Sequence, residues 1–455
     1  MEKVKSTQFV RKNKKGDQKI LEKELKDAIV STKKIVSDGK CIYYFKDDRL
    51  LEKLSFEGNR KIRKYLFEEN AQSVISYQLM ERIISDLIVD TRIELNDTIL
   101  NPERYINLVN GIFDLQEKSF YSNEESEVDK KFTYVIDAKY LKAEERKMPK
   151  FEEFLVKSLG SKMNEDESIY LLESIGFLLS SVNTLRKVVI FIGAMGSGKS
   201  TLARFIASLV QPSTEVSYVT FQELNQKFKL FDVVNAKLNV GDEMNKGTMR
   251  NLAQFKAITS GEYITVEQKG RDPVKVKANV RQLYTTNHLP QFDDGNAAAV
   301  YDRLNIINFP NTISLEDRDL NLYYELLEER DSIVSAALDY FAIVFSDKNG
   351  VFTEPSKIKK SKAICLDDDL SIERFLKNLK FDENSVGISS RELFERYCSF
   401  CHENAFRRKN KTELKERIIQ IFSKYGVEYK KKRISKTKNV WSYTCLKYQE
   451  DDSNE

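Results

Sequence analysis

The sequence predicts an α/β fold built on a parallel sheet, and the centre of the chain carries the observations that support this. Residues 188–192 are apolar and mostly β-branched, which is typical of a buried strand, and residues 202–209 follow as an apolar helix. Between them, residues 193–200 fit the pattern G-x-x-x-x-G-K-[ST]. A strand, a glycine-rich loop and a helix in this order indicate a P-loop domain.

The glycine-rich loop is predicted to bind the phosphates of ATP. Glycines let consecutive N–H groups point inward at a phosphate, and the helix that follows adds the positive end of its dipole. Lys199 would neutralise the β- and γ-phosphates, and Ser200 would bind Mg²⁺. The predicted nucleotide-binding residues are contiguous: Gly193, Ala194, Met195, Gly196, Ser197, Gly198, Lys199, Ser200 and Thr201. A Gly/Ser-rich turn that binds nothing is the alternative, which the complete pattern in its required context disfavours.

Composition indicates a globular intracellular enzyme. The chain has 455 residues, 41% of them hydrophobic, and a net charge of only +4, so overall charge says nothing about nucleic acid. We find no run of 18 apolar residues and no signal peptide, so we expect a cytoplasmic protein that does not contact membranes and has reduced cysteines. Cys398, Cys401 and His402 match a haem-attachment motif, but they lie on an amphipathic helix of a chain with no export signal, so the two cysteines are interpreted as buried thiols on a helix face.

An acidic pair is predicted at the end of a second strand. Residues 238–240 are predicted to form a short strand, and Asp242 and Glu243 follow at its end. Carboxylates at the end of a strand beside the P-loop would manage Mg²⁺ and the attacking water, so Asp242 is assigned to the Mg²⁺ shell and Glu243 to the water. Asn239 and Gly241 interrupt the apolar run of this strand. A solvated strand end is the alternative interpretation.

Two further residues complete the predicted catalytic set. Asn287 ends an alternating strand over 280–284, and its amide could hold both the γ-phosphate and the lytic water. Arg303 precedes a strand over 304–309 and could stabilise the transferring phosphoryl group of a neighbouring subunit. An ordinary turn and a surface ion pair with Asp302 are the respective alternatives.

In their order, these motifs resemble superfamily 3 helicases of the AAA+ class. The resemblance rests on the P-loop, Asp242-Glu243, the stretch from 260 to 271, Thr285-Thr-Asn287, and Arg303 with 308–310. It is nearest to the phage, plasmid and poxvirus primase–helicase family, and to the replication-initiator helicases of phage satellites and pathogenicity islands. Residues 110–114 and 173–177 resemble the helical domain that precedes the motor in that family. Too few residues precede the resemblance to imply a primase domain.

The resemblance implies a hexameric ring that holds single-stranded DNA in its channel and moves 3′ to 5′. The sequence itself supports a DNA-contacting hairpin, because 262–268 and 274–277 alternate like two strands. Lys269 and Arg271 would lie at the tip of this hairpin and contact DNA. A charged tip that only keeps the protein soluble is the alternative.

The C-terminal part predicts a winged helix-turn-helix. Helices are expected over 371–379, 389–401 and 412–425, with strands over 427–433 and 440–446, and Ser389 as an N-cap. The segment from Arg407 to Lys438 contains thirteen Lys and Arg but only three Glu. This excess of positive charge favours binding of duplex DNA over a basic packing module. The predicted DNA contacts of this part are Arg407, Arg408, Lys411, Lys415, Lys430, Lys431, Lys432, Arg433, Lys436 and Lys438.

The expected organisation has six parts. These are a basic arm (1–40), a mainly helical domain (41–160), the motor (161–346), a flexible linker (347–369), the winged-helix domain (370–447) and an acidic tail (448–455). Together they predict an ATP-driven replicative helicase that also opens the duplex origin of a mobile genetic element, with a separate primase or polymerase as a possible partner. An ATP-switched origin-binding protein, a duplex-translocating packaging or recombination motor, and a metabolite kinase remain as alternatives.

Overall fold

The computed structural model describes most of the chain, in two compact units that are treated separately. The described residues are 3–37, 42–46, 49–53, 64, 66–95, 100–125, 130–242, 248–249, 252–267, 273–287, 291–292, 297–314, 316–360, 362, 371–383, 385, 387–403, 408–422, 425–435 and 438–448. The first unit comprises 1–245, 253–289 and 303–354, and the second comprises 246–252, 290–302 and 355–455.

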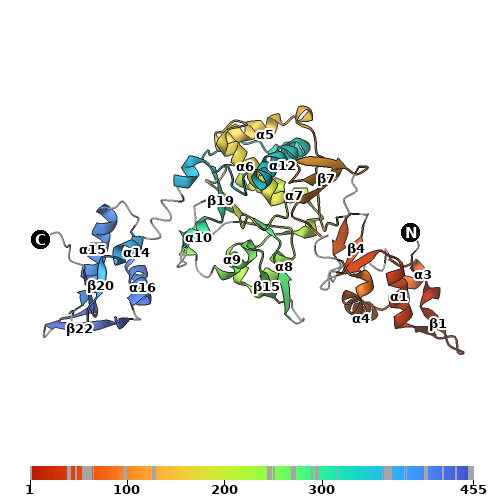
Figure 1. Ribbon diagram of the computed structural model, residues 1–455, viewed down its shortest axis with the longest axis horizontal. Coiled ribbons are helices and arrows are strands. Elements are labelled where there is room, and N and C mark those ends of the chain that lie inside the picture. The colour runs from red at the N-terminus through yellow and green to blue at the C-terminus, as the bar shows by residue number, and fades with distance from the viewer. Residues whose placement is uncertain are drawn as a thin grey trace. The chain divides into compact units, whose positions relative to one another are not determined.

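A five-stranded parallel sheet forms the centre of the first unit and confirms the predicted α/β class (Figure 1). Its spatial order is β12-β13-β17-β10-β19, so β17 lies between the P-loop strand β10 and the acidic strand β13. The strands span Val216–Ser217 (β12), Leu238–Gly241 (β13), Arg281–Thr286 (β17), Val188–Gly193 (β10) and Leu304–Phe309 (β19). Because all pairs are parallel, the carboxyl ends of the strands meet at one edge.

Helices cover both faces of this sheet. In Figure 1, α5, α6, α7 and α12 gather on one side, and α8 and α9 with β15 lie on the other. The helices are α5 (Pro149–Phe154), α6 (Asp166–Leu179), α7 (Lys199–Leu209), α8 (Lys227–Val234), α9 (Ala253–Thr259), α11 (Leu322–Glu328) and α12 (Arg330–Ser346), with a π-helical turn at Leu155–Leu159. Helices α6 and α12 touch closely, since a Cβ on Gly176 would lie 2.4 Å from the carbonyl oxygen of Ala337. None of the described helices is long and apolar enough to cross a membrane.

The hairpin predicted near residue 270 is present as far as it is described. Strand β15 (Tyr263–Val266) pairs antiparallel with β16 (Val274–Lys277), in the register Tyr263↔Lys277 to Val266↔Val274. Ile264 and Val266 are buried while Tyr263 is exposed, which is the alternation of a half-buried strand. The hairpin tip, with Lys269 and Arg271, lies outside the described residues.

The region expected to be mainly helical is a mixture of strands and helices, which corrects the prediction. A second five-stranded sheet, in the order β11-β9-β6-β7-β8, occupies much of it. Its strands are β6 (Tyr105–Leu108), β7 (Gly111–Asp114), β8 (Ser119–Ser122), β9 (Val135–Ile136) and β11 (Val210–Gln211). The predicted Asn110-Gly111 turn joins β6 to β7. The sequence pattern did not indicate the other strands because they are short. One of them, β11, also lies far along the chain, directly after α7.

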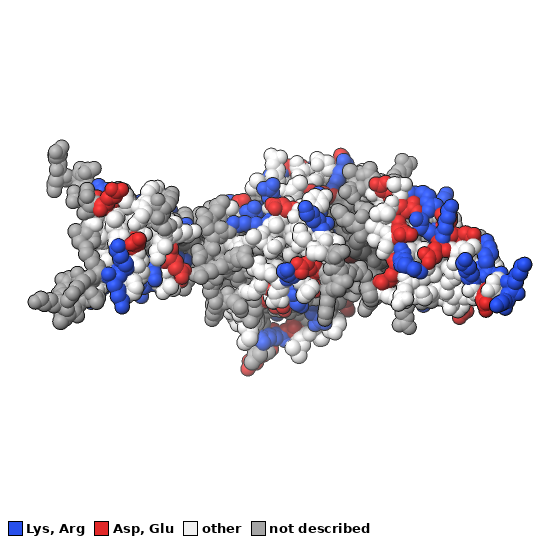
Figure 2. Space-filling model, turned by 90° about the horizontal axis from the view of Figure 1, so that it is seen from below, with Lys and Arg blue, Asp and Glu red and all other residues white. Residues whose placement is uncertain are grey.

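The predicted basic arm is folded over its described residues, 3–37, because it packs against a later segment. These residues contain β1 (Val10–Lys12), β2 (Gln18–Ile20), α1 (Glu22–Ser31) and β3 (Ile35–Ser37), and β3 pairs with β4 (Ile42–Phe45), which pairs with β5 (Leu51–Lys53). Phe9 and Leu25 share a buried cluster with Phe67 and Met80. Met80 belongs to α4 (Tyr77–Ile88), which follows α3 (Glu69–Gln72) in the chain. Lysines and arginines still gather over the exposed β1–β2 hairpin in the face shown by Figure 2.

The described part of the predicted flexible linker is structured, which corrects the prediction for these residues: 348–354 are packed, and 356–360 are helical. Glu173 of α6 is fully buried and accepts hydrogen bonds from Lys348 Nζ (3.0 Å), the Thr353 N–H (2.6 Å) and Thr353 Oγ1 (2.7 Å). A buried carboxylate needs such partners, so residues 348–354 pack on the first unit. Residues 363–370 of the predicted linker lie outside the described part of the chain.

The second unit contains the predicted helices and strands of the C-terminal part in the expected order. They are α14 (Ser371–Leu376), α15 (Ser390–Glu403), α16 (Lys411–Phe422), β22 (Tyr429–Ser435) and β23 (Lys438–Tyr443). Ser389 accepts the N–H of Glu392 at 3.2 Å, which confirms the predicted N-cap. Of the two thiols predicted to be buried, Cys401 is buried and Cys398 is only partly buried. Short strands that the sequence did not indicate are β14 (Thr248–Met249), β18 (Gln291–Phe292), β20 (Leu379–Phe381), β21 (Ile388–Ser389) and β24 (Leu446–Tyr448), besides helix α10 (Ala297–Tyr301).

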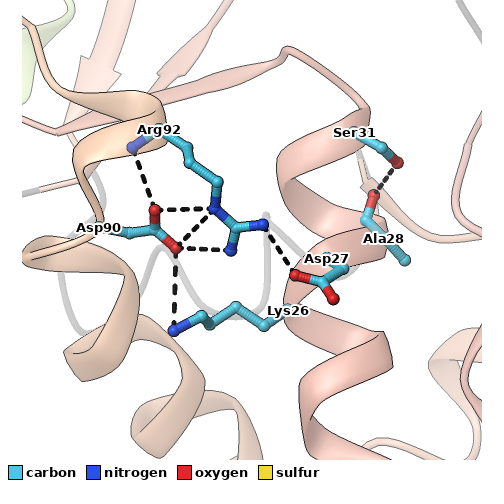
Figure 3. Close-up of polar contacts among 6 residues, drawn as sticks. All are labelled: Lys26, Asp27, Ala28, Ser31, Asp90 and Arg92. Carbon is cyan, nitrogen blue, oxygen red and sulfur yellow. Dashed lines mark hydrogen bonds and ion pairs between the residues drawn. The ribbon is translucent and has the colours of Figure 1, made fainter.

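An ion-pair network joins α1 to the turn that follows α4 (Figure 3). Arg92 bonds Asp90 at 2.7 Å and Asp27 at 2.8 Å, and Lys26 Nζ lies 3.8 Å from Asp90. The hydrogen bond from Arg92 lowers the pKa of Asp90 from 3.8 to about 2. Since the charged carboxylate is favoured in the folded state, this network stabilises the fold above the ordinary pKa of Asp90.

The network predicts a pH-dependent effect of Asp90→Asn. At neutral pH the variant should unfold at a temperature a few degrees lower than the native protein, because Arg92 loses one of its two charged partners. This difference should shrink as the pH falls from about 4 towards about 2, where native Asp90 also becomes protonated. Thermal unfolding followed by circular dichroism at several pH values measures it. Asp86→Asn, an exposed aspartate of α4, is the control, and parallel pH profiles for the native protein and Asp90→Asn would contradict the assignment.

Candidate functional site

The P-loop connects β10 to α7, and its glycines occupy positions where a side chain would be strained or would clash. Gly196 and Gly198 have φ values of 82° and 93°, which residues with a Cβ rarely adopt. A Cβ on Gly193 would lie 2.4 Å from the carbonyl oxygen of Phe309, so this position also has no room for a side chain. Gly198 is the N-cap of α7 and, having no side chain, makes no capping hydrogen bond to the first N–H groups of the helix. These N–H groups fit the phosphates of a nucleotide.

Lys199 is held inside the loop rather than in solvent. Its side-chain nitrogen donates to the carbonyl oxygens of Gly193 (2.5 Å) and Ala194 (2.8 Å), and to Ser197 Oγ (3.3 Å). The residue is buried, and burial lowers the pKa of its ammonium group. A buried cation without an anionic partner is costly, so a bound phosphate would stabilise the charged form of Lys199.

The ends of two neighbouring strands bring predicted site residues to the same edge. Asn287 follows β17, and its Oδ1 lies 3.5 Å from Lys199 Nζ. Asp242 follows β13, is exposed, and accepts a hydrogen bond from Thr285 Oγ1 at 3.1 Å. Ser200 is also exposed, at the start of α7. Glu243, the predicted partner of the attacking water, lies outside the described residues.

The two residues that interrupt the apolar pattern of β13 have a structural explanation. Asn239 is fully buried, and its amide bonds Ser217 Oγ (2.8 Å) and both the N–H (3.0 Å) and the carbonyl oxygen (2.9 Å) of Val219. A Cβ on Gly241 would lie 2.5 Å from the ring of Tyr284 on β17. Both residues therefore fix β13 in the sheet, and the chain reaches Asp242 in regular strand geometry.

Arg303 lies at the opposite end of the sheet from the P-loop. Its carbonyl oxygen accepts the N–H of Val188 at 2.8 Å, at the start of β10, whereas Gly193 at the end of β10 pairs with Phe309. A six-residue strand spans about 20 Å. Arg303 Nη2 lies instead 3.5 Å from Ser260 Oγ. The structure thus separates Arg303 from Lys199 of the same chain.

Arg318 also lies at the P-loop, although no sequence pattern indicated it. Its guanidinium group lies over the P-loop, since a Cβ on Gly196 would be 2.3 Å from Arg318 Nη2. The segment is tied to the loop, because the N–H of Ile313 donates to the carbonyl oxygen of Gly196 at 3.1 Å. Among the described residues, Arg318 has no carboxylate partner. Its neighbours in sequence are Asp317 and Asp319, so no local pattern distinguished it from a surface arginine.

The predicted DNA contacts of the C-terminal part are only partly described. Arg408, Lys411, Lys430 and Lys431 are exposed, and Lys415 is half-buried. Arg407 and Lys436 lie outside the described residues, and only the backbone is described for Lys432, Arg433 and Lys438. Lys432 and Arg433 lie on β22, and Lys438 begins β23. Most of the predicted contacts therefore belong to α16 and the β22–β23 hairpin.

Three family models match the chain. A model described as D5 N terminal like matches residues 6–159, a model described as poxvirus D5 protein-like matches 371–450, and a family of unknown function, DUF5906, matches 191–303. The chain thus belongs to the D5-like family of superfamily 3 primase–helicases, as the sequence predicted. This family indicates a replication-associated NTPase or helicase, and it implies a nucleotide and Mg²⁺ as cofactors.

The chain is also similar to solved structures. Two structures of the NrS-1 C-terminal region, the A form apo structure and the apo structure of residues 305–718, are each 14% identical to it and cover 92% of it. The TM-scores are 0.45 and 0.46, and the matches cover 98% and 97% of those chains. Curated protein sequences give no match.

The position of Arg318 predicts that it contributes to nucleotide binding. In Arg318→Ala, KM for ATP should rise about tenfold or more, because a charge-assisted hydrogen bond is lost. Arg318→Lys should recover part of this loss. ATP hydrolysis by the full-length protein, measured over a range of ATP concentrations, gives KM and kcat separately. Lys199→Ala is the reference variant, in which hydrolysis should disappear, and an unchanged KM in Arg318→Ala would exclude the contact.

Proposed function

We propose that the protein is an ATP-driven, ring-forming DNA helicase that acts in replication. The observation that carries this proposal is the grouping of Lys199, Asn287 and Asp242 at the carboxyl edge of one parallel sheet, in a chain of the D5-like family. Groups that bind phosphate, sense it and hold a cation are what phosphoryl transfer to water requires.

The roles within one nucleotide site follow from the chemistry of each group. The N–H groups at the start of α7 and Lys199 would bind the β- and γ-phosphates. Ser200 and Asp242 would hold Mg²⁺ together with phosphate oxygens. Mg²⁺ is commonly held in this way, by one or two protein oxygen ligands together with substrate phosphates. Glu243 would polarise the attacking water, and Asn287 would hydrogen-bond the γ-phosphate.

Arg303 supports a shared site between subunits. It lies one strand length from Lys199 of its own chain, so it can act on a nucleotide only in another copy. An arginine supplied in this way stabilises the charge of the transferring phosphoryl group. A head-to-tail interface of this kind forms a ring when the rotation between subunits closes, and we infer a closed ring. The expected size, a hexamer, is what the family resemblance implies.

The expected substrates are single-stranded DNA in the ring and a duplex origin outside it. Lys269 and Arg271 would hold phosphates of the single strand at the tip of the β15–β16 hairpin, with translocation from 3′ to 5′. The basic surface of α16 and the β22–β23 hairpin would bind origin duplex of a mobile genetic element. Its lysines supply charge and its helix supplies a shape that fits the major groove.

Shared sites predict that two inactive variants can restore activity when mixed. Arg303→Ala should bind ATP but lose turnover by about a thousandfold or more, and Glu243→Gln should also be inactive. In a mixed ring, some interfaces combine an intact Glu243 with an intact Arg303 from the next subunit. ATPase activity measured across mixing ratios should therefore pass through a maximum.

The control for mixing is a pair of variants on the same side of the interface. Lys199→Ala mixed with Glu243→Gln should not recover activity, since both changes affect the subunit that binds the nucleotide. If no ratio of Arg303→Ala and Glu243→Gln recovers activity although labelled subunits exchange, Arg303 does not act between subunits.

A further inference from the structure

The β22–β23 hairpin carries an aromatic pair that the proposed phosphate contacts do not use. The rings of Tyr429 and Trp441 stack with centroids 4.8 Å apart and an angle of 7° between their planes. The two strands are antiparallel, with Tyr429 opposite Tyr443 and Lys431 opposite Trp441, so these four residues share one face of the hairpin. Figure 1 shows β22 next to α16 within the second unit.

Exposure increases along this face from the core to the solvent. Tyr443 is 1% exposed and belongs to the core of the second unit, and Tyr429 packs partly against that core. Trp441 is 44% exposed, although an indole is among the most apolar side chains. The hydrophobic core therefore holds one end of the aromatic pair in place and leaves the outer ring accessible.

Two lysines place positive charge on the same aromatic pair. Lys415 Nζ, from α16, lies 4.3 Å from the centroid of the Tyr429 ring, and Lys431 Nζ lies 5.5 Å from the centroid of the Trp441 ring. Neither lysine forms an ion pair with a carboxylate among the residues that the structure describes. The charge thus remains available for an anion that approaches the indole, and the flexible, exposed Lys431 can move aside from the ring.

We propose that Tyr429 and Trp441, with Lys415 and Lys431, form a stacking platform for an unpaired base of a DNA strand. A base has a flat π-face that stacks on an indole, while the phosphate beside it attracts the two ammonium groups. In an intact duplex the faces of the bases are covered by their neighbours, so the platform selects single strands or opened duplex ends. This inference rests on the proposed function, because it places an unpaired strand next to a duplex-binding surface.

Trp441 allows a direct test, because the chain contains only one tryptophan. Full-length protein is titrated with a single-stranded oligothymidylate and with a blunt duplex of equal length, while tryptophan emission is recorded. The single strand should quench the emission, since a base stacks on the indole, and the duplex should leave it nearly unchanged. Affinity is measured in parallel by the anisotropy of labelled DNA, without ATP and at two salt concentrations.

Variants of Trp441 test stacking, and a control variant with thermal unfolding tests whether the unit is still folded. Trp441→Ala should weaken single-strand binding about five- to a hundredfold, and Trp441→Phe should retain most of it, because an aromatic face remains. Tyr425→Ala is the matched control, since Tyr425 is a 50% exposed aromatic residue of the same unit outside the hairpin. Thermal unfolding of each variant shows that the unit is still folded.

Each outcome has a defined meaning. Quenching by the single strand, together with its loss of affinity in Trp441→Ala, supports the platform. The protein could instead bind and unwind DNA without any change in tryptophan emission, with Trp441→Ala binding single strands as tightly as the native protein. That result would contradict the stacking platform and leave the proposed function intact. Equal quenching by the duplex overturns the preference for unpaired bases. Absence of any DNA binding overturns both the platform and the proposed function.

Discussion

The position of β17 between β10 and β13 is the constraint on which the proposed nucleotide site depends. Parallel pairing of Val189 with Leu283 and of Val240 with Leu283 aligns the three strands, so their carboxyl ends stop at one level. Asn287 then reaches Lys199, and Thr285 reaches Asp242. A shift of β17 by one residue would turn its side chains to the other face and separate these groups.

The same sheet gives a reason for assembly. Since parallel strands direct all their carboxyl ends to one edge, Arg303 at the start of β19 cannot approach Lys199 of its own chain. If Arg303 acts on a nucleotide as proposed, this geometry would place the two halves of the shared site at opposite edges of one sheet. In the proposed ring, each interface would join one edge of a subunit to the other edge of the next, and hydrolysis would depend on their contact.

The sequence predicted what local patterns determine and missed what distant packing determines. The P-loop, Asp242, Asn287 and the Ser389 cap depend on a few adjacent residues, and the sequence located each of them in its element. Arg318 is near the P-loop only because Ile313 bonds to Gly196, and residues 348–354 pack on the first unit only because Glu173 is buried far away in sequence. The lysine-rich residues 1–40 indicated an arm, yet Phe9 and Leu25 find their apolar partners near residues 67–80. Composition cannot predict such contacts, because they depend on the fold.

The most direct measurement of the central claim is ATP-dependent separation of a forked DNA by the full-length protein, with ATP hydrolysis followed in the same sample. The native protein should separate the strands, and Lys269→Ala should hydrolyse ATP without separating them, because the hairpin would transmit nucleotide-driven motion to the DNA. If the native protein separates no strands while duplex DNA stimulates its hydrolysis, the account of a helicase is contradicted, and an ATP-switched or duplex-translocating protein takes its place.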